Sequence, residues 1–134
     1  MADIDKLEFI LVDDDQIFCT VIRLISRNFP ERDIFLRTFP NGSEALRFFR
    51  ANKEYSNKEN LVVFVDINMP IMDGWELLEH IQQEGLLDPA LTPIYIISSS
   101  IRERERTTAT SVRILRGILT KPISQKELFN ILSK

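Results

Sequence analysis

The amino-acid sequence predicts a doubly wound α/β domain, that is, a parallel β-sheet with helices on both faces. Five short apolar runs alternate with segments whose apolar residues recur at helical spacing. The apolar runs are continuous, which is typical of strands that are buried on both faces of a parallel sheet. The alternation of strand and helix indicates right-handed crossover connections. The length of 134 residues fits one domain with one substantial core.

Each predicted strand is an apolar run that polar or turn-forming residues follow. The five runs cover residues 9–12, 34–39, 61–65, 94–97 and 117–119. Runs of this length between turn signals are too short for helices of ordinary size. We therefore expect five parallel strands.

Amphipathic segments separate these runs. In the first segment, one helical face carries Ile17, Val21, Leu24, Ile25 and Phe29, and we expect this face to pack on the sheet. The second and third helices have apolar faces of three residues each, namely Ala45, Leu46 and Phe49, then Trp75, Leu78 and Ile81. The last two helices are predicted over residues 102–115 and 124–132, and the polar segment 51–60 is predicted to be a surface loop.

Composition and charge narrow the classes of function. The formal net charge of -3 argues against general nucleic-acid binding, which needs a basic surface. The single cysteine, Cys19, excludes an internal disulfide. No secretory signal precedes the first apolar run, which is far too short to span a membrane. These observations predict a cytoplasmic protein with no membrane segment. Only one helix follows the last strand, so the sequence predicts a single domain over residues 1–134 with no output domain.

Polar residues follow four of the five predicted strands. They are Asp13, Asp14 and Asp15 after the first strand, Asp66 after the third, Ser98 to Ser100 after the fourth and Lys121 after the fifth. Ligands of an open parallel sheet bind beyond the carboxyl ends of its strands, near the point where the strand order reverses. We therefore expect these side chains to meet at one edge of the sheet.

The acidic residues at this edge predict a metal site. Carboxylates on adjacent loops repel one another, and a hard cation with oxygen ligands offsets the cost of burying them. Mg²⁺ fits best, because it uses few carboxylates and leaves positions for water and phosphate oxygens. We assign Asp13 and Asp14 to the metal and Asp15 to the N-cap of the first helix.

Asp66, Lys121 and Ser98 could act together on a phosphoryl group. A carboxylate can attack phosphorus to give an acyl phosphate, and a cation and a hydroxyl can stabilise the charge on the phosphoryl oxygens. Taken singly, each residue has a plainer interpretation: the aspartate as a helix cap, the lysine as a surface residue and the serine as part of a loop.

Four sequence segments together resemble a known family, the receiver domains of two-component response regulators, which are CheY-like. The segments are Ile10-Leu11-Val12-Asp13-Asp14-Asp15, Val65-Asp66-Ile67-Asn68-Met69-Pro70-Ile71-Met72-Asp73-Gly74, Ile97-Ser98-Ser99 and Leu119-Thr120-Lys121-Pro122. The resemblance covers essentially the whole chain, and the ordered combination of the four segments is far more specific than any one of them.

The resemblance implies a fold and a set of site residues. The sheet would have the strand order 2-1-3-4-5 with five flanking helices. Asp66 would be the phosphoacceptor, and Lys121 would pair with the phosphoryl oxygens. Mg²⁺ would be bound directly by Asp14 and Asp66, through water by Asp13, and by the backbone carbonyl of Asn68.

The resemblance also implies a conformational switch at Ser98 and the proteins that would act on either side of it. The hydroxyl of Ser98 would move toward the phosphoryl group, and the bond between Lys121 and Pro122 would be cis. The phosphoryl donor would be a sensor histidine kinase or a histidine phosphotransfer protein, and a downstream protein target would read the phosphorylated form. The implied protein is a phosphoacceptor switch and not an enzyme, and a dimer that forms on phosphorylation is compatible with it.

The sequence departs from the family at one position, since Ile118 stands where many receivers have an aromatic residue three residues before the lysine.

Three other functions can be compared with this interpretation. A receiver-like module that binds proteins without phosphorylation is the main alternative, which the full set of Asp13, Asp14, Asp66, Ser98 and Lys121 disfavours. A phosphatase of the haloacid dehalogenase type needs an acid where this chain has Asn68. A flavodoxin-like site is disfavoured because three acids would repel the phosphate of a flavin.

Overall fold

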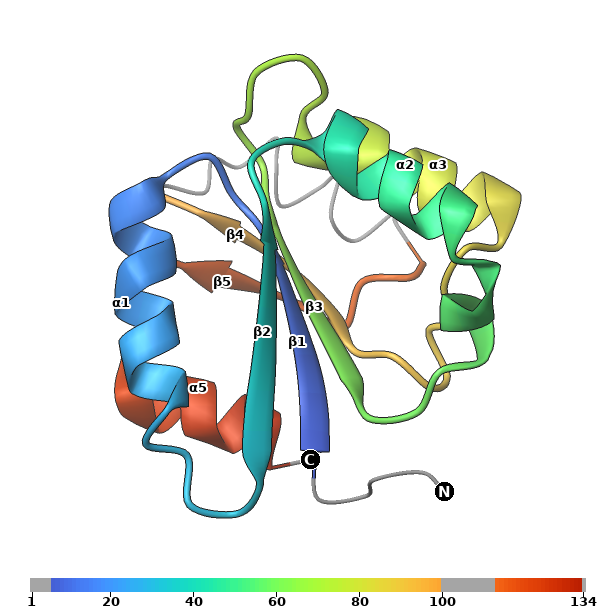
Figure 1. Ribbon diagram of the computed structural model, residues 1–134. Coiled ribbons are helices and arrows are strands. Elements are labelled where there is room, and N and C mark those ends of the chain that lie inside the picture. Colours follow the sequence, from blue (N-terminus) through green and yellow to red (C-terminus); the bar gives the residue numbers. More distant parts are fainter. Residues whose placement is uncertain (1–5, 100–112, 134) are drawn as a thin grey trace.

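The computed structural model describes residues 6–99 and 113–133, which form a parallel sheet between two layers of helices (Figure 1). The strands are β1 (Lys6–Val12), β2 (Asp33–Phe39), β3 (Leu61–Asp66), β4 (Ile94–Ser98) and β5 (Gly117–Thr120). The helices are α1 (Gln16–Ser26), α2 (Gly42–Ala51), α3 (Gly74–Glu84) and α5 (Gln125–Leu132), with a 3₁₀-helix, η1 (Lys53–Asn57). The strand order is β2-β1-β3-β4-β5, and every neighbouring pair is parallel. This confirms the predicted fold class.

Both faces of the sheet are covered, which explains the continuous apolar runs. Leu7, Phe9 and Leu11 of β1 belong to the core beneath α1 and α5. Ile10 and Val12 of the same strand belong to the core beneath α2 and α3. Figure 1 shows these two helix pairs on opposite sides of the sheet. Successive residues of a strand point to opposite faces, so a strand between two helix layers must be apolar at every position.

The predicted buried face of α1 is wrong for Ile17, Val21 and Leu24, whereas Phe29 is buried and Ile25 packs against the core as predicted. Phe18, Ile22 and Ser26 are the buried residues of this helix, whereas Ile17, Val21 and Leu24 are exposed by 79%, 45% and 54%. The helix has two apolar stripes with helical spacing, and periodicity alone cannot tell which of them faces the sheet. The outer stripe of Ile17, Val21 and Leu24 remains open to solvent in the described part of the chain.

The predicted surface loop at 51–60 is instead partly ordered and anchored. It contains η1, in which Tyr55 is buried. The Tyr55 hydroxyl donates to the carboxylate of Glu8, at 3.0 Å from Oε1 and 2.8 Å from Oε2, and Arg37 Nε lies 3.2 Å from the same carboxylate. A polar segment can thus contribute to the core because one aromatic residue within it reaches a buried acid.

Most of the predicted fourth helix, residues 102–115, lies outside the described residues. Its last described positions, Arg113 and Ile114, form a turn and not a helix. The predicted helix at the C-terminus is confirmed as α5, with Ser124 as its N-cap. In the ranges 6–99 and 113–133, no helix is long and apolar enough to cross a bilayer.

Candidate functional site

Three carboxylates meet at the C-terminal edge of the sheet. Asp13 and Asp14 follow β1, and Asp66 is the last residue of β3, the strand that pairs with β1. Their potential ligand oxygens all lie within 4.8 Å of one another. Asp13 and Asp66 are buried, with only 3% and 5% of their surface exposed, whereas Asp14 is exposed. The structure therefore brings together three of the residues predicted from the sequence.

Backbone contacts hold Asp13 in place. Its N–H donates to the carbonyl of Phe39 at 2.9 Å, and its Oδ1 accepts from the N–H of Asp15 at 2.9 Å. Asp15 in turn caps α1, because its Oδ1 accepts from the N–H groups of Ile17 and Phe18 at 3.0 and 3.1 Å. This confirms the prediction that Asp15 is the N-cap and leaves the other two acids for the site.

Lys121 reaches the carboxylates from the end of β5. Its Nζ lies 2.8 Å from Asp13 Oδ2, 3.8 Å from Asp66 Oδ2 and 4.0 Å from Asp15 Oδ2. The Lys121 N–H donates to the carbonyl of Ser98 at 2.8 Å, which joins the ends of β5 and β4. The peptide bond between Lys121 and Pro122 is cis, as the resemblance implies.

Burial and charge shift the pKa values of Asp66 and Lys121. Burial and then the negative charge of Asp13 raise the pKa of Asp66 to about 7, although Lys121 acts in the opposite direction. For Lys121, burial lowers the pKa, but the hydrogen bond and the charge of Asp13, together with Asp66, outweigh burial and raise it. In the absence of a metal, a large fraction of Asp66 is therefore protonated at neutral pH, while Lys121 is charged.

The donor set fits a hard divalent cation. All three candidate ligands are carboxylates, and one ammonium group cannot neutralise three negative charges in a partly buried site. Asp13 Oδ2 is buried, and the close partner that the described residues give it is the ammonium group of Lys121, at 2.8 Å. An oxygen ligand set of this kind suits Mg²⁺.

The loop between β3 and α3 is fixed close to Asp66. The N–H of Ile67 donates to the carbonyl of Ile97 at 3.0 Å, and the N–H of Gly74 donates to the carbonyl of Ile67 at 2.9 Å. A side chain at Gly74 would collide with the carbonyl oxygen of Asp66, so only glycine fits there. Asn68 lies in this loop and is exposed, and its carbonyl as a metal ligand stays a prediction.

Ser98 and Ile118 lie on the last two strands. Ser98 ends β4, is 1% exposed and follows Ile97, whose register partner in β3 is Asp66. Ile118 is partly buried against the core beneath α2 and α3 and pairs with Ile96. The structure thus places the predicted switch hydroxyl at the same edge of the sheet as Asp66.

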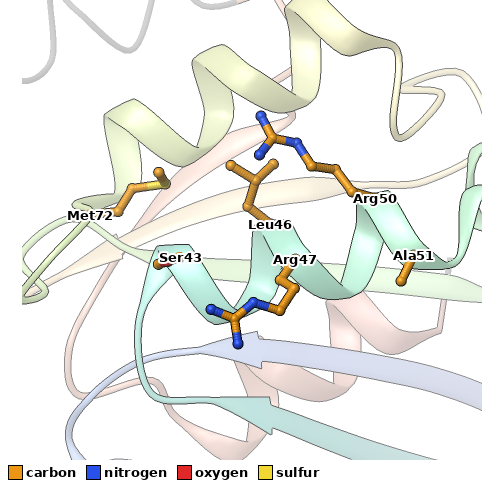
Figure 2. Close-up of a pocket in the computed structure, with 6 residues that line it drawn as sticks. All are labelled: Ser43, Leu46, Arg47, Arg50, Ala51 and Met72. Atoms are coloured by element: carbon orange, nitrogen blue, oxygen red, sulfur yellow. The ribbon is translucent and has the colours of Figure 1, made fainter.

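Two hollows lie near these elements. One of about 330 Å³ opens beside Asp13 and Asp14, between α1 and the end of β2. The other, of about 500 Å³, lies between α2 and Met72. Figure 2 shows Leu46 and Met72 along this second hollow, with Arg47 and Arg50 nearby. Among the described residues, no carboxylate lines the second hollow, so it is distinct from the acidic site.

One residue of the site was missed by the sequence analysis. Lys121 Nζ lies over the ring of Phe18, 4.4 Å from the ring centroid. Phe18 lies on α1, one helical turn after the cap at Asp15. The sequence analysis placed its neighbour Ile17 on the buried face, so nothing in the sequence pointed to this contact.

The comparisons with known proteins agree with this geometry. Residues 9–133 match the family model of the response regulator receiver domain. The chain belongs to this family. Receiver domains of this family are phosphoacceptor switches of two-component signalling.

Two curated relatives show how receiver domains of this kind occur in longer proteins. A two-component response regulator of Arabidopsis thaliana is 30% identical over 129 residues, which cover 91% of this chain and 21% of the relative. A protein-glutamate methylesterase/protein-glutamine glutaminase of Halalkalibacterium halodurans is 28% identical over 118 residues, covering 87% of this chain and 31% of the relative. The chain thus spans less than a third of either relative.

Solved structures show the same fold. The phosphorylated cyanobacterial phytochrome response regulator RcpA matches with a TM-score of 0.71 and 26% identity, over 95% of this chain and 89% of that one. A two-component response regulator from Cytophaga hutchinsonii matches with a TM-score of 0.78 and 22% identity, over 94% and 92% of the two chains. The second likeness concerns the fold alone.

Proposed function

We propose that Asp66 accepts a phosphoryl group from a phosphohistidine, with Mg²⁺ held by the neighbouring acids. The observation that carries this proposal is the convergence of Asp13, Asp14 and Asp66 within 4.8 Å, with Lys121 beside them. The donor would be a sensor histidine kinase or a histidine phosphotransfer protein, and the phosphorylated form would signal to a downstream protein. The protein itself is a switch that acts on its own side chain.

The chemistry assigns a role to each residue. A carboxylate oxygen of Asp66 attacks phosphorus, the bond between phosphorus and the donor's imidazole nitrogen breaks, and its electron pair stays on that nitrogen. Asp14, Asp66 and the carbonyl of Asn68 would hold Mg²⁺ directly, with Asp13 acting through water. The bound cation would supply positive charge to the phosphoryl oxygens.

The raised pKa of Asp66 supports a requirement for the metal. Only the ionised carboxylate is a nucleophile, and the pKa of about 7 leaves much of Asp66 protonated at neutral pH. A cation beside Asp66 favours the charged form and so lowers this pKa. Lys121 then neutralises charge that develops on the phosphoryl oxygens.

The outer stripe of α1 supports docking of the phosphoryl donor next to the site. Ile17, Val21 and Leu24 are exposed on the helix that begins directly after the acids. Large apolar side chains that are spaced one turn apart on an open helix face suit packing against a partner's helices. A donor seated on this stripe would lie beside Asp14 and Asp66.

The switch would begin at Ser98. Its hydroxyl, at the end of β4, would move toward the phosphoryl group and shift the chain that follows this strand. Because residue 118 is an isoleucine, β5 has no aromatic ring that could rotate together with the Ser98 hydroxyl. We therefore propose that the change is transmitted from Ser98 without an aromatic partner on β5.

The test is the intact mass of the protein after incubation with acetyl phosphate, with and without Mg²⁺. We expect an adduct of one phosphoryl group that needs the metal and is lost in Asp66→Asn. Asp33→Asn is the matched control, because Asp33 is exposed at the opposite end of the sheet, where it pairs with Lys6. If the wild type forms no adduct under any condition, the proposal fails and a phosphorylation-independent binding module is favoured.

A further inference from the structure

Lys121 has two kinds of partner in the site. Its ammonium group is 2.8 Å from Asp13 Oδ2 and 3.8 Å from Asp66 Oδ2. It also lies over the ring of Phe18, 4.4 Å from the centroid. The contact with Asp13 is an ion pair, and the contact with Asp66 is one whenever Asp66 is ionised. The contact with Phe18 is a cation–π contact, in which the partner of the ammonium is the face of an uncharged ring.

The two kinds of contact respond differently to a cation. When a divalent metal binds beside Asp13, the negative charge that this residue offers to Lys121 is shared with the metal. The ion pair at 2.8 Å would then weaken, and the ammonium would have to move toward Asp66 to reach phosphoryl oxygens. The neutral ring of Phe18 has no charge for the metal to compete for, so its attraction to the ammonium persists.

The ring of Phe18 is held rigidly enough to serve as a support. Phe18 is only 9% exposed and packs in the core beneath α1 and α5. Its N–H donates to the Oδ1 of Asp15 at 3.1 Å, which fixes the first turn of α1 below the site. A side chain that is packed in the core and joined to a capped helix end keeps its rotamer.

We propose that Phe18 is a positioning residue for Lys121. Its ring keeps the ammonium group at the site while the lysine passes from Asp13 to the phosphoryl oxygens on Asp66. The inference rests on the proposed function, but the contact itself can be tested without any phosphorylation.

The experiment compares three variants with the wild type. Phe18→Leu keeps an apolar side chain and removes the ring, whereas Phe18→Tyr restores a ring face. Phe29→Leu is the matched control, since Phe29 is 7% exposed, lies in the same core and makes an edge-to-face contact with Phe129 instead of a contact with Lys121. Two quantities are measured: the rate of adduct formation from acetyl phosphate at saturating Mg²⁺, and the proton chemical shift of the Lys121 ε-methylene group, assigned by its loss in Lys121→Arg.

We expect Phe18→Leu to form the adduct about threefold to tenfold more slowly, which corresponds to the loss of one cation–π contact. Phe18→Tyr should recover most of the rate, and Phe29→Leu should keep it. The Lys121 ε-methylene signal should lie upfield of the other lysines in the wild type, in Phe18→Tyr and in Phe29→Leu, and return to the ordinary position in Phe18→Leu. Thermal melts show that each variant is folded.

Other results would overturn the inference. Equal rates for Phe18→Leu and the wild type, or equal slowing by Phe29→Leu, would show that the ring does not act through Lys121. If the wild type forms no adduct, the proposed function fails, and the NMR signal alone decides on the positioning. An ordinary Lys121 shift in the wild type then refutes it, and an upfield shift that is lost in Phe18→Leu supports it.

Discussion

The substitution Asp66→Asn should raise the free energy of unfolding of the metal-free protein, and the size of this increase should depend on pH. The pKa of this carboxyl is raised from 3.8 to about 7 in the folded state, chiefly by burial and by the charge of Asp13. Below about pH 4 the group is protonated in both the folded and the unfolded chain, so it has no effect on stability. Between about pH 4 and 7 the folded state retains a proton that the unfolded state has lost, so stability falls as the pH rises.

The size of the effect follows from the shift. About three pKa units at 1.36 kcal/mol each set an upper limit of about 4 kcal/mol for the free energy that Asp66→Asn can regain at pH 8. The amide also places a donor group toward the ammonium of Lys121, which lies 3.8 Å from Asp66. We therefore expect a gain of about 2 kcal/mol at pH 8, and almost none at pH 4.

Urea unfolding in EDTA at pH 8, 6 and 4, with Asp33→Asn as the control, measures this gain. Mg²⁺ should narrow the difference at pH 8, because a metal that binds only the folded wild type adds its binding free energy to that protein. If Asp66→Asn is no more stable than the wild type at pH 8, or if its gain is the same at pH 4, then burial and Asp13 do not act on this carboxyl as we argue.

Three further predictions concern residues around the site and the core. Gly74→Ala should lower the free energy of unfolding by about 3 kcal/mol, because the added methyl group meets the carbonyl of Asp66; an unchanged urea midpoint would refute the close contact. Cys19 in the folded protein should react with iodoacetamide at pH 8 about 100-fold more slowly than in urea, because burial and nearby carboxylates raise its pKa to about 11; similar rates in both states would contradict this. Tyr55→Phe should cost about 1 to 2 kcal/mol in urea unfolding, because it removes the donor to the buried Glu8, and a neutral result would mean that Glu8 is satisfied without it.

The strands could be predicted from the sequence because both faces of the sheet are covered. A run such as residues 61–65 is apolar at every position, and few other structures require this pattern. The first helix shows the limit of such reasoning. Its apolar residues form two stripes, and only the packing of the whole domain decides that Phe18 and Ile22 face inward while Ile17 and Val21 do not.

The residues that make up the site could also be predicted from the sequence, but the contacts among them could not. Parallel strands end at one edge, so Asp13, Asp66 and Lys121 had to come close together. Lys121 lies 2.8 Å from Asp13 but 3.8 Å from Asp66, and no sequence pattern encodes a difference of this size. The same holds for the ring of Phe18, whose contact with Lys121 joins a helix to a strand that is distant in sequence.

The close contact at Gly74 divides the site into a stiff side and a compliant side. The backbone of α3 abuts the backbone of Asp66 without room for one methyl group, so the end of β3 and the start of α3 must travel together as a single block. On the other side, Lys121 meets the ring of Phe18 on α1 and the carboxylate of Asp15 at the N-cap of this helix, and both contacts are made by side chains. A displacement at Asp66 is therefore passed to α3 through backbone contacts, whereas toward α1 it acts through the side chain of Lys121, which can rotate against the fixed ring of Phe18.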